Sequence, residues 1–243
     1  MKFTSFILVF FCQVANLAIA ETISAPTTIS TTPLPSENPT SEQLRGQRQF
    51  FVGPRYGLMS SAVPAYGLEA GYHLNSSWQF GLSFATGSMD VKGLANSYAN
   101  IPDTIRLNTA TISNQMIVAN ARYFVLNSFY LGLGLGQRTF KYEVDLEMKD
   151  GSGGINVKGV VNSIVLTPHV GNIWTLDNGI YLGAEWFGLA LPLASTKSTD
   201  INYRGPFIPT VLQDDENDIQ SATDKVGRSI SFSAVMAHAG YSF

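Results

Sequence analysis

The sequence predicts an all-β fold: an eight-stranded, antiparallel, up-and-down transmembrane β-barrel that follows an N-terminal signal peptide and a disordered linker. Three observations predict it. The last strand has two different faces, only 14% of the residues are charged, and short and long connections alternate along the chain. Soluble domains carry about 25% charged residues. No apolar run of about 18 residues follows the N-terminal segment, so membrane helices do not explain the low charge.

The C-terminal strand alternates between an apolar face and a small or polar face. Counting back from the end, Phe243, Tyr241, Ala239 and Ala237 share one side, and smaller or polar residues separate them. A strand with lipid on one side and a lumen on the other needs this period of two. We interpret Tyr241 and Phe243 as a C-terminal assembly signal.

Residues 1–20 have the three parts of a signal peptide. Lys2 supplies the positive charge, residues 3–17 are apolar, and the Ala-Ile-Ala of residues 18–20 fits a cleavage site. The apolar stretch is short for the alternative, a transmembrane anchor. Cys12 is the only cysteine and leaves with the signal peptide, so we expect no disulfide and no thiolate metal site in the mature chain.

Residues 21–47 are rich in Thr, Pro and Ser and contain no aromatic residue. Such a segment buries too little apolar surface to offset the entropy lost on ordering. We predict a disordered periplasmic segment. A short docking tail for peptidoglycan or a partner protein is the alternative.

After this linker, the chain reads as eight strands separated by turn residues. Two-residue turns at 75–76, 126–127 and 177–178 follow the second, fourth and sixth strands. Long connections, at 92–108 and 195–226, follow the third and seventh. Short turns on one rim and longer loops on the other are typical of barrels that cross the outer membrane, with both termini on the periplasmic side. The predicted strands cover residues 49–59, 64–74, 77–91, 109–125, 128–146, 155–175, 179–194 and 227–243.

In these features the chain resembles the small eight-stranded bacterial outer-membrane barrel superfamily, including the outer membrane protein A transmembrane domain and the OmpX-like, opacity-type and OmpW-like proteins. The resemblance covers residues 48–243, carries no motif of one subfamily, and rests on the strand pattern and the final Tyr-Ser-Phe. It implies location in the bacterial cell outer membrane. The implied partners are outer-membrane lipids and the barrel assembly machinery.

Charged residues are predicted inside the lumen. The alternation places Arg55, Glu69 and Glu185 on inward positions, and Arg122 joins them if its strand, whose two faces are ambiguous, turns that way. Isolated buried charges are costly, so opposite charges should pair. We predict an Arg–Glu network that plugs the lumen. A porin-like gate that makes the barrel a narrow channel for small solutes is the alternative.

An enzymatic role is disfavoured by the positions of the three histidines. Some small outer-membrane barrels modify lipid A with a His, a Ser and an acid near the membrane surface. Here His73 lies by a periplasmic turn, His169 and His238 face the lumen, and none has the local His-x-Ser pattern of the lipid A deacylases. A lipid A-modifying enzyme is therefore a lesser alternative. No cluster has metal-ligand spacing, and no cofactor is predicted.

The long loops are the expected contact region for any extracellular ligand. Loops 92–108 and 195–226 lie on the outer rim, and the second contains the acidic run 214–218. That run lacks the spacing of a calcium loop, and it also suits a solvated surface. The net charge of -3 gives no electrostatic case for nucleic-acid binding. We predict a non-enzymatic barrel with a structural or surface-interaction, adhesin-like role.

Overall fold

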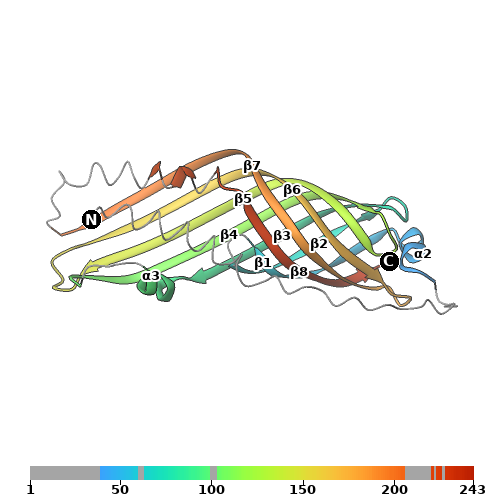
Figure 1. Ribbon diagram of the computed structural model, residues 1–243, viewed down its shortest axis with the longest axis horizontal. Coiled ribbons are helices and arrows are strands. Elements are labelled where there is room, and N and C mark those ends of the chain that lie inside the picture. The colour runs from blue at the N-terminus through green and yellow to red at the C-terminus, as the bar shows by residue number, and fades with distance from the viewer. Residues whose placement is uncertain (1–38, 60–62, 99–102, 206–219, 222, 226–227) are drawn as a thin grey trace.

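The computed structural model describes residues 39–59, 63–98, 103–205, 220–221, 223–225 and 228–243, and its strands form one closed barrel (Figure 1). Each strand pairs antiparallel with its neighbour in sequence, and the first pairs with the last, which confirms the predicted eight-stranded fold. The predicted signal peptide lies outside the described residues. The strands are β1 (Phe50–Met59), β2 (Val63–His73), β3 (Trp78–Asp90), β4 (Ile105–Phe124), β5 (Phe129–Met148), β6 (Gly154–Thr175), β7 (Ile180–Arg204) and β8 (Ser231–Ser242).

The outer surface of the barrel is an apolar band. In β5, Leu131, Leu133 and Leu135 point outward and remain about half exposed. Similar exposed residues occur on all eight strands. Trp78, Tyr123 and other aromatic residues lie toward the end of the barrel that carries the short turns, which we call the turn end. A band of this size facing water would be unstable, whereas lipid solvates it. Among the described helices, none has the length and apolar character needed to cross a membrane.

Four strands are much longer than the others. Strands β4 to β7 have 20 to 25 residues, whereas β1, β2, β3 and β8 have 10 to 13. The prediction of a loop over 195–226 is therefore wrong for residues 195–204, which continue β7. The loop predicted over 92–108 likewise contains helix α3 (Lys92–Tyr98) and the start of β4. We call the extension the part of β4 to β7 that lies farther from the short turns than the start of β8. In β7 it comprises residues 191–204.

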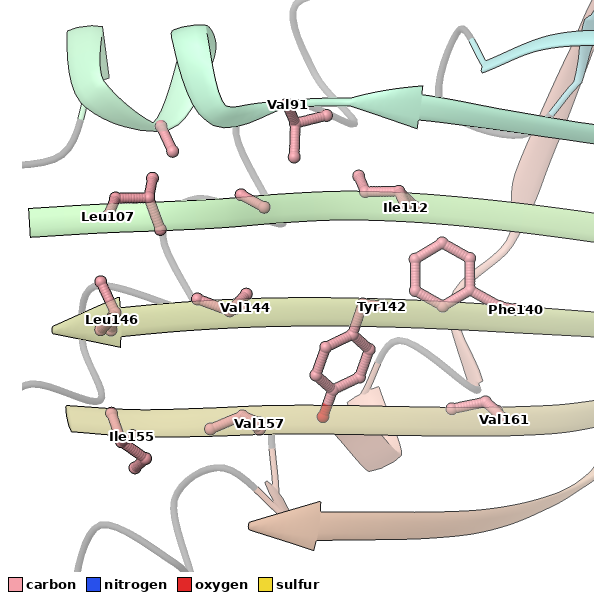
Figure 2. Packing of buried hydrophobic residues seen from close by; sticks show 12 residues of the cluster. Val91, Leu107, Ile112, Phe140, Tyr142, Val144, Leu146, Ile155, Val157 and Val161 are labelled. Carbon is pink, nitrogen blue, oxygen red and sulfur yellow. The ribbon is translucent and has the colours of Figure 1, made fainter. Parts of the chain in front are cut away.

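The extension is ordered because its inner face is apolar. The inward residues of β4, β5 and β6 form a buried cluster (Figure 2). Ile201 and Tyr203 of β7 pack against it. Helix α3 covers one side through Ala95. The Tyr142 hydroxyl lies 2.5 Å from the Thr223 hydroxyl, so the chain before β8 also packs here. Burial of this face offsets the entropy of ordering the long strands.

Helix α2 (Ser41–Gln47) lies where the sequence predicts disorder, and it corrects that part of the prediction for residues 21–47. Thr40 and Gln43 form a capping box, in which each side chain accepts a hydrogen bond from the other's backbone N–H. The helix packs against the turn end of the barrel (Figure 1). Residues 21–38 lie outside the described part of the chain.

The seam between β1 and β8 contains a bulge. The register shifts between Gly57 and Leu58, and Val235 in the opposite strand has a φ of 46°. A β-branched residue in this left-handed region is strained, at a cost of about 1–3 kcal/mol. Hydrogen bonds on both sides of the bulge keep the seam closed.

The lipid-facing band predicts the effect of a charge placed in it. Leu133→Arg should lower the free energy of unfolding by about 2–4 kcal/mol, because an outward Arg near the bilayer midplane is poorly solvated. Urea unfolding in lipid vesicles measures the change. Ser198→Arg is the control: Ser198 is exposed on the extension, and its substitution should change stability by less than about 0.5 kcal/mol. Equal effects at both positions would contradict the membrane placement.

Candidate functional site

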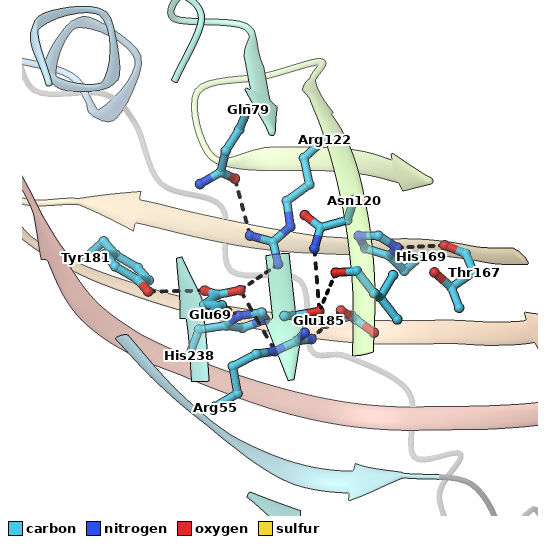
Figure 3. Close-up of polar contacts among 12 residues, drawn as sticks. Arg55, Glu69, Gln79, Asn120, Arg122, Thr167, His169, Tyr181, Glu185 and His238 are labelled. Carbon is cyan, nitrogen blue, oxygen red and sulfur yellow. Dashed lines mark hydrogen bonds and ion pairs between the residues drawn. The ribbon is translucent and has the colours of Figure 1, made fainter. Parts of the chain in front are cut away.

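The candidate site is the charged middle of the lumen. The structure brings together all four residues singled out there: Arg55 from β1, Glu69 from β2, Arg122 from β4 and Glu185 from β7 (Figure 3). Each is at most 7% exposed. The ambiguous strand turns Arg122 inward, where it is fully buried. Two arginines and two glutamates therefore share one desolvated layer.

Glu69 is the centre of this layer. Its Oε2 accepts a hydrogen bond from Arg122 Nη2 at 2.8 Å and lies 3.8 Å from Arg55 Nε. Its Oε1 accepts from the Tyr181 hydroxyl at 3.2 Å and lies 2.9 Å from His238 Nδ1. One carboxylate thus joins side chains from four other strands. Charge-assisted hydrogen bonds of this kind are stronger than neutral ones.

The two arginines extend the network across the lumen. Arg55 Nη2 donates to Glu185 Oε2 at 2.8 Å, which links β1 to β7. Arg122 Nη1 donates to Gln79 Oε1 at 3.2 Å, and its guanidinium carbon lies 5.1 Å from the centre of the Tyr130 ring. These contacts fix both guanidinium groups inside the barrel, as pairing of buried charges requires.

Sequence reasoning placed His238 in the lumen but did not assign it, Gln79 or Tyr181 to the network. All three lie at inward positions of the alternation, so the parity of their strands could have identified them. His169 also faces the lumen, as expected, and its Nδ1 lies 2.9 Å from the carbonyl of Thr167. His73 packs beside Phe51 near the turn end.

Glycines on β5 make room for the large lumen side chains. A Cβ on Gly132 would overlap the His169 ring, and one on Gly134 would overlap the Thr167 hydroxyl. The Gly-Leu-Gly-Leu-Gly run of residues 132–136 therefore places small residues inward and leucines toward lipid. A glycine in a strand suits close packing or curvature, and the contacts here show close packing.

Two further layers close the lumen on the turn side of the network. The first is a buried aromatic cluster that includes Phe51, Phe124, Tyr130 and Tyr181. Its rings pack edge to face: Phe51 and Tyr181 have centroids 5.9 Å apart, and Phe124 and Tyr130 have centroids 5.8 Å apart. Water-filled passage would require these rings to separate.

The second layer is helix α2. Arg45 donates to the carbonyls of Ser76 and Asn127, and its guanidinium carbon lies 3.7 Å above the centre of the Phe124 ring. Ser41 Oγ donates to the carbonyl of Thr175. The helix thus contacts two of the three short connections and the end of β6, and Arg48, which follows the helix, donates to the carbonyl of Asp177 in the third connection. Burial lowers the pKa of Arg45 to about 10, and the Glu42 carboxylate opposes this shift.

The two C-terminal aromatic residues face outward. Tyr241 and Phe243 are 48% and 59% exposed, and their rings lie 6.4 Å apart. Phe50 of β1 stacks on Phe243 at 6.0 Å, so these rings mark the seam at the turn end. Their role as an assembly signal stays a prediction. Within the described ranges, no group of three or more His, Cys, Asp or Glu could hold a metal ion.

A closed ring of eight antiparallel strands, with an apolar exterior and a filled polar lumen, defines the class of this protein. It is a transmembrane β-barrel of the bacterial outer-membrane type. Every backbone donor and acceptor that crosses the lipid must be paired, and closure of the sheet meets this requirement.

No protein-family model matches the sequence, and no curated protein matches it. Among solved structures, Acinetobacter baumannii CarO is similar, with 10% identity and a TM-score of 0.48 over 82% of this chain and 99% of that chain. Acinetobacter baumannii CarO2 has 14% identity and a TM-score of 0.42, over 81% and 100%. A major outer membrane protein from Thermus thermophilus has 10% identity and a TM-score of 0.45, over 80% of this chain and 98% of that chain. The class assignment rests on the strand topology and surface of this chain itself.

The network predicts a large effect when its central carboxylate is removed. Glu69→Ala should lower the free energy of unfolding by about 3–5 kcal/mol, because it leaves Arg122 and Arg55 buried with one carboxylate between them. Urea unfolding in vesicles measures this change. Glu147→Ala is the matched control: Glu147 pairs with Arg106 at 2.7 Å on the exposed rim, and its loss should cost at most about 1 kcal/mol. A loss no larger than that control would show that Glu69 is not central.

Proposed function

We propose that this protein is a closed outer-membrane barrel that acts through its extracellular surface, with a structural or adhesin-like role and without enzymatic activity. The observation that carries the proposal is the combination of a lumen filled at three levels with an ordered extension above the membrane. Side chains of the described residues fill the lumen at these levels, which supports a barrel closed to solutes, and the extension offers a surface. Rigid scaffolds of this kind commonly present binding regions.

The extension supports the surface role because it holds a fixed shape. Its outer face carries ion pairs between neighbouring strands, including Arg106 with Glu147 at 2.7 Å and Lys158 with Glu143 at 3.0 Å. Its inner face is the buried apolar cluster. At about 2.5 Å of height per residue in a tilted strand, residues 191–204 rise roughly 30 Å above the level where β8 begins.

The absence of enzymatic activity is proposed from the burial of the titratable groups. His238 and His169 are 3% and 7% exposed, and both lie inside the lumen layer with Glu69 and Glu185. A catalytic group must reach its substrate, and lipid A lies in the outer leaflet. These buried groups are instead suited to holding the barrel closed.

The closed lumen predicts that the barrel has no stable ion conductance. Purified protein in planar lipid bilayers should give no large, stable open currents, because the aromatic cluster, the charged network and α2 lie in series. Steady conductance from most insertion events would contradict the closed lumen and would favour the narrow channel. The Glu69→Ala variant is the comparison, since loss of its contacts should increase the frequency of brief openings.

The extension predicts surface binding that depends on the β5–β6 hairpin. Cells that display the full chain should adhere to immobilised fibronectin or collagen. A variant in which Asn-Gly replaces residues 144–157 should lose this adhesion, because it removes the upper hairpin while keeping the Glu143–Lys158 pair in register. Heat-modifiable migration in gels checks that both barrels fold. Equal adhesion by the two barrels, or none by the full chain, would contradict the proposal for these probes.

A further inference from the structure

A cavity of about 30 Å³ lies in the lumen next to the charged network, on the side facing the extension. Its polar lining includes Arg55, Arg122 and Glu185, and Figure 3 shows His169 and Thr167 on one side of this group. Asn120 adds another polar side chain to the lining, and Met59, Met116, Val118 and Leu189 are among its apolar residues. The glycines of β5 next to His169 and Thr167 have no side chains, which leaves room for these two residues.

Several polar atoms of the lining residues are buried and have no hydrogen-bond partner among the described residues. They are Asn120 Oδ1, Thr167 Oγ1, His169 Nε2, Arg55 Nε and Arg122 Nε. The five side chains belong to residues at most 8% exposed. A buried polar atom without a hydrogen bond costs about 1–3 kcal/mol, so five such atoms on residues that line one cavity require an explanation.

The unpaired atoms include both donors and acceptors. His169 Nδ1 faces a carbonyl, which can only accept, so this nitrogen carries a proton; in a ring with a single proton, Nε2 is then an acceptor. Asn120 Oδ1 is also an acceptor, whereas the two arginine Nε–H groups are donors. A bound anion would need donors alone, and a bound cation would need acceptors alone. Water donates and accepts, and it matches the mixed set.

We propose that two water molecules occupy this cavity and complete the hydrogen bonds of the charged network. A buried water requires about 10–15 Å³ of such volume and two to four polar partners, and both requirements are met for two molecules. The waters join Thr167, His169 and Asn120 to the arginines. They thereby lower the cost of keeping four charges inside a membrane protein. The inference holds whether or not the extracellular surface binds a partner.

Two isosteric substitutions test whether the cavity is wet. Thr167→Val removes a hydroxyl without changing the volume. With water present, it deletes a hydrogen-bond partner and should lower the urea midpoint in lipid vesicles. In a dry cavity it would remove an orphaned hydroxyl and raise the midpoint. Val118→Thr adds a hydroxyl to the same lining: it should leave the midpoint nearly unchanged if water is present, and lower it if the cavity is dry.

Diffraction from the unmodified protein tests the same point without a variant. Crystals grown in sodium bromide, measured at the bromine edge, should show two peaks within hydrogen-bonding distance of Thr167 and His169 and no anomalous signal. An anomalous peak in the cavity would assign it to an anion and overturn the proposal. A cavity without density in a high-resolution map would overturn it as well.

Discussion

The width of an eight-stranded ring is the constraint on which the rest of this structure depends. A barrel of this size has an interior that side chains from opposite walls can fill. Each large inward residue therefore needs a small neighbour. The Tyr130 ring would clash with a Cβ on Gly171, and the Tyr181 ring with one on Gly53 or Gly240. These glycines therefore provide the space that the aromatic side chains of the lumen occupy.

The same narrow interior explains why the charges lie together. A lone buried Arg or Glu would carry a large desolvation penalty, which opposite charges offset only with good geometry and further hydrogen bonds. Glu69 has that geometry, because partners from four strands reach its two oxygens. The network thus ties β1, β2, β4, β7 and β8 to one another through the lumen, in addition to their backbone ladders.

The sequence contains most of the fold and part of the site. Strand parity places Arg55, Glu69 and Glu185 in the lumen, because the period of two survives even where strands differ in length. It leaves Arg122 ambiguous, since Asn120 and Arg122 share a side with Met116 and Phe124. Only the contacts of Arg122 with Glu69, Gln79 and Tyr130 in the folded barrel show that it turns inward. Which inward side chains contact one another depends on the register between strands that are far apart in sequence. The alternation of residues along one strand does not specify that register.

The elements that sequence reasoning missed are those stabilised by tertiary contacts. Helix α2 has only seven residues and depends on the turns that it covers, although Thr40 and Gln43 mark its start. The upper part of β7 reads as a polar loop, because Ser, Thr and Asp predominate there. It is a strand because Ile201 and Tyr203 pack against a cluster contributed by other strands.

The strained Val235 gives the barrel wall a preferred line of separation. Strands β1 and β8 are both short and meet at a bulge, whereas β5, β6 and β7 are about twice as long. During thermal unfolding the β1–β8 junction should therefore part first, and the tall hairpins opposite should part last. A lipid or hydrophobic molecule that entered the wall sideways would find its lowest barrier at the same junction.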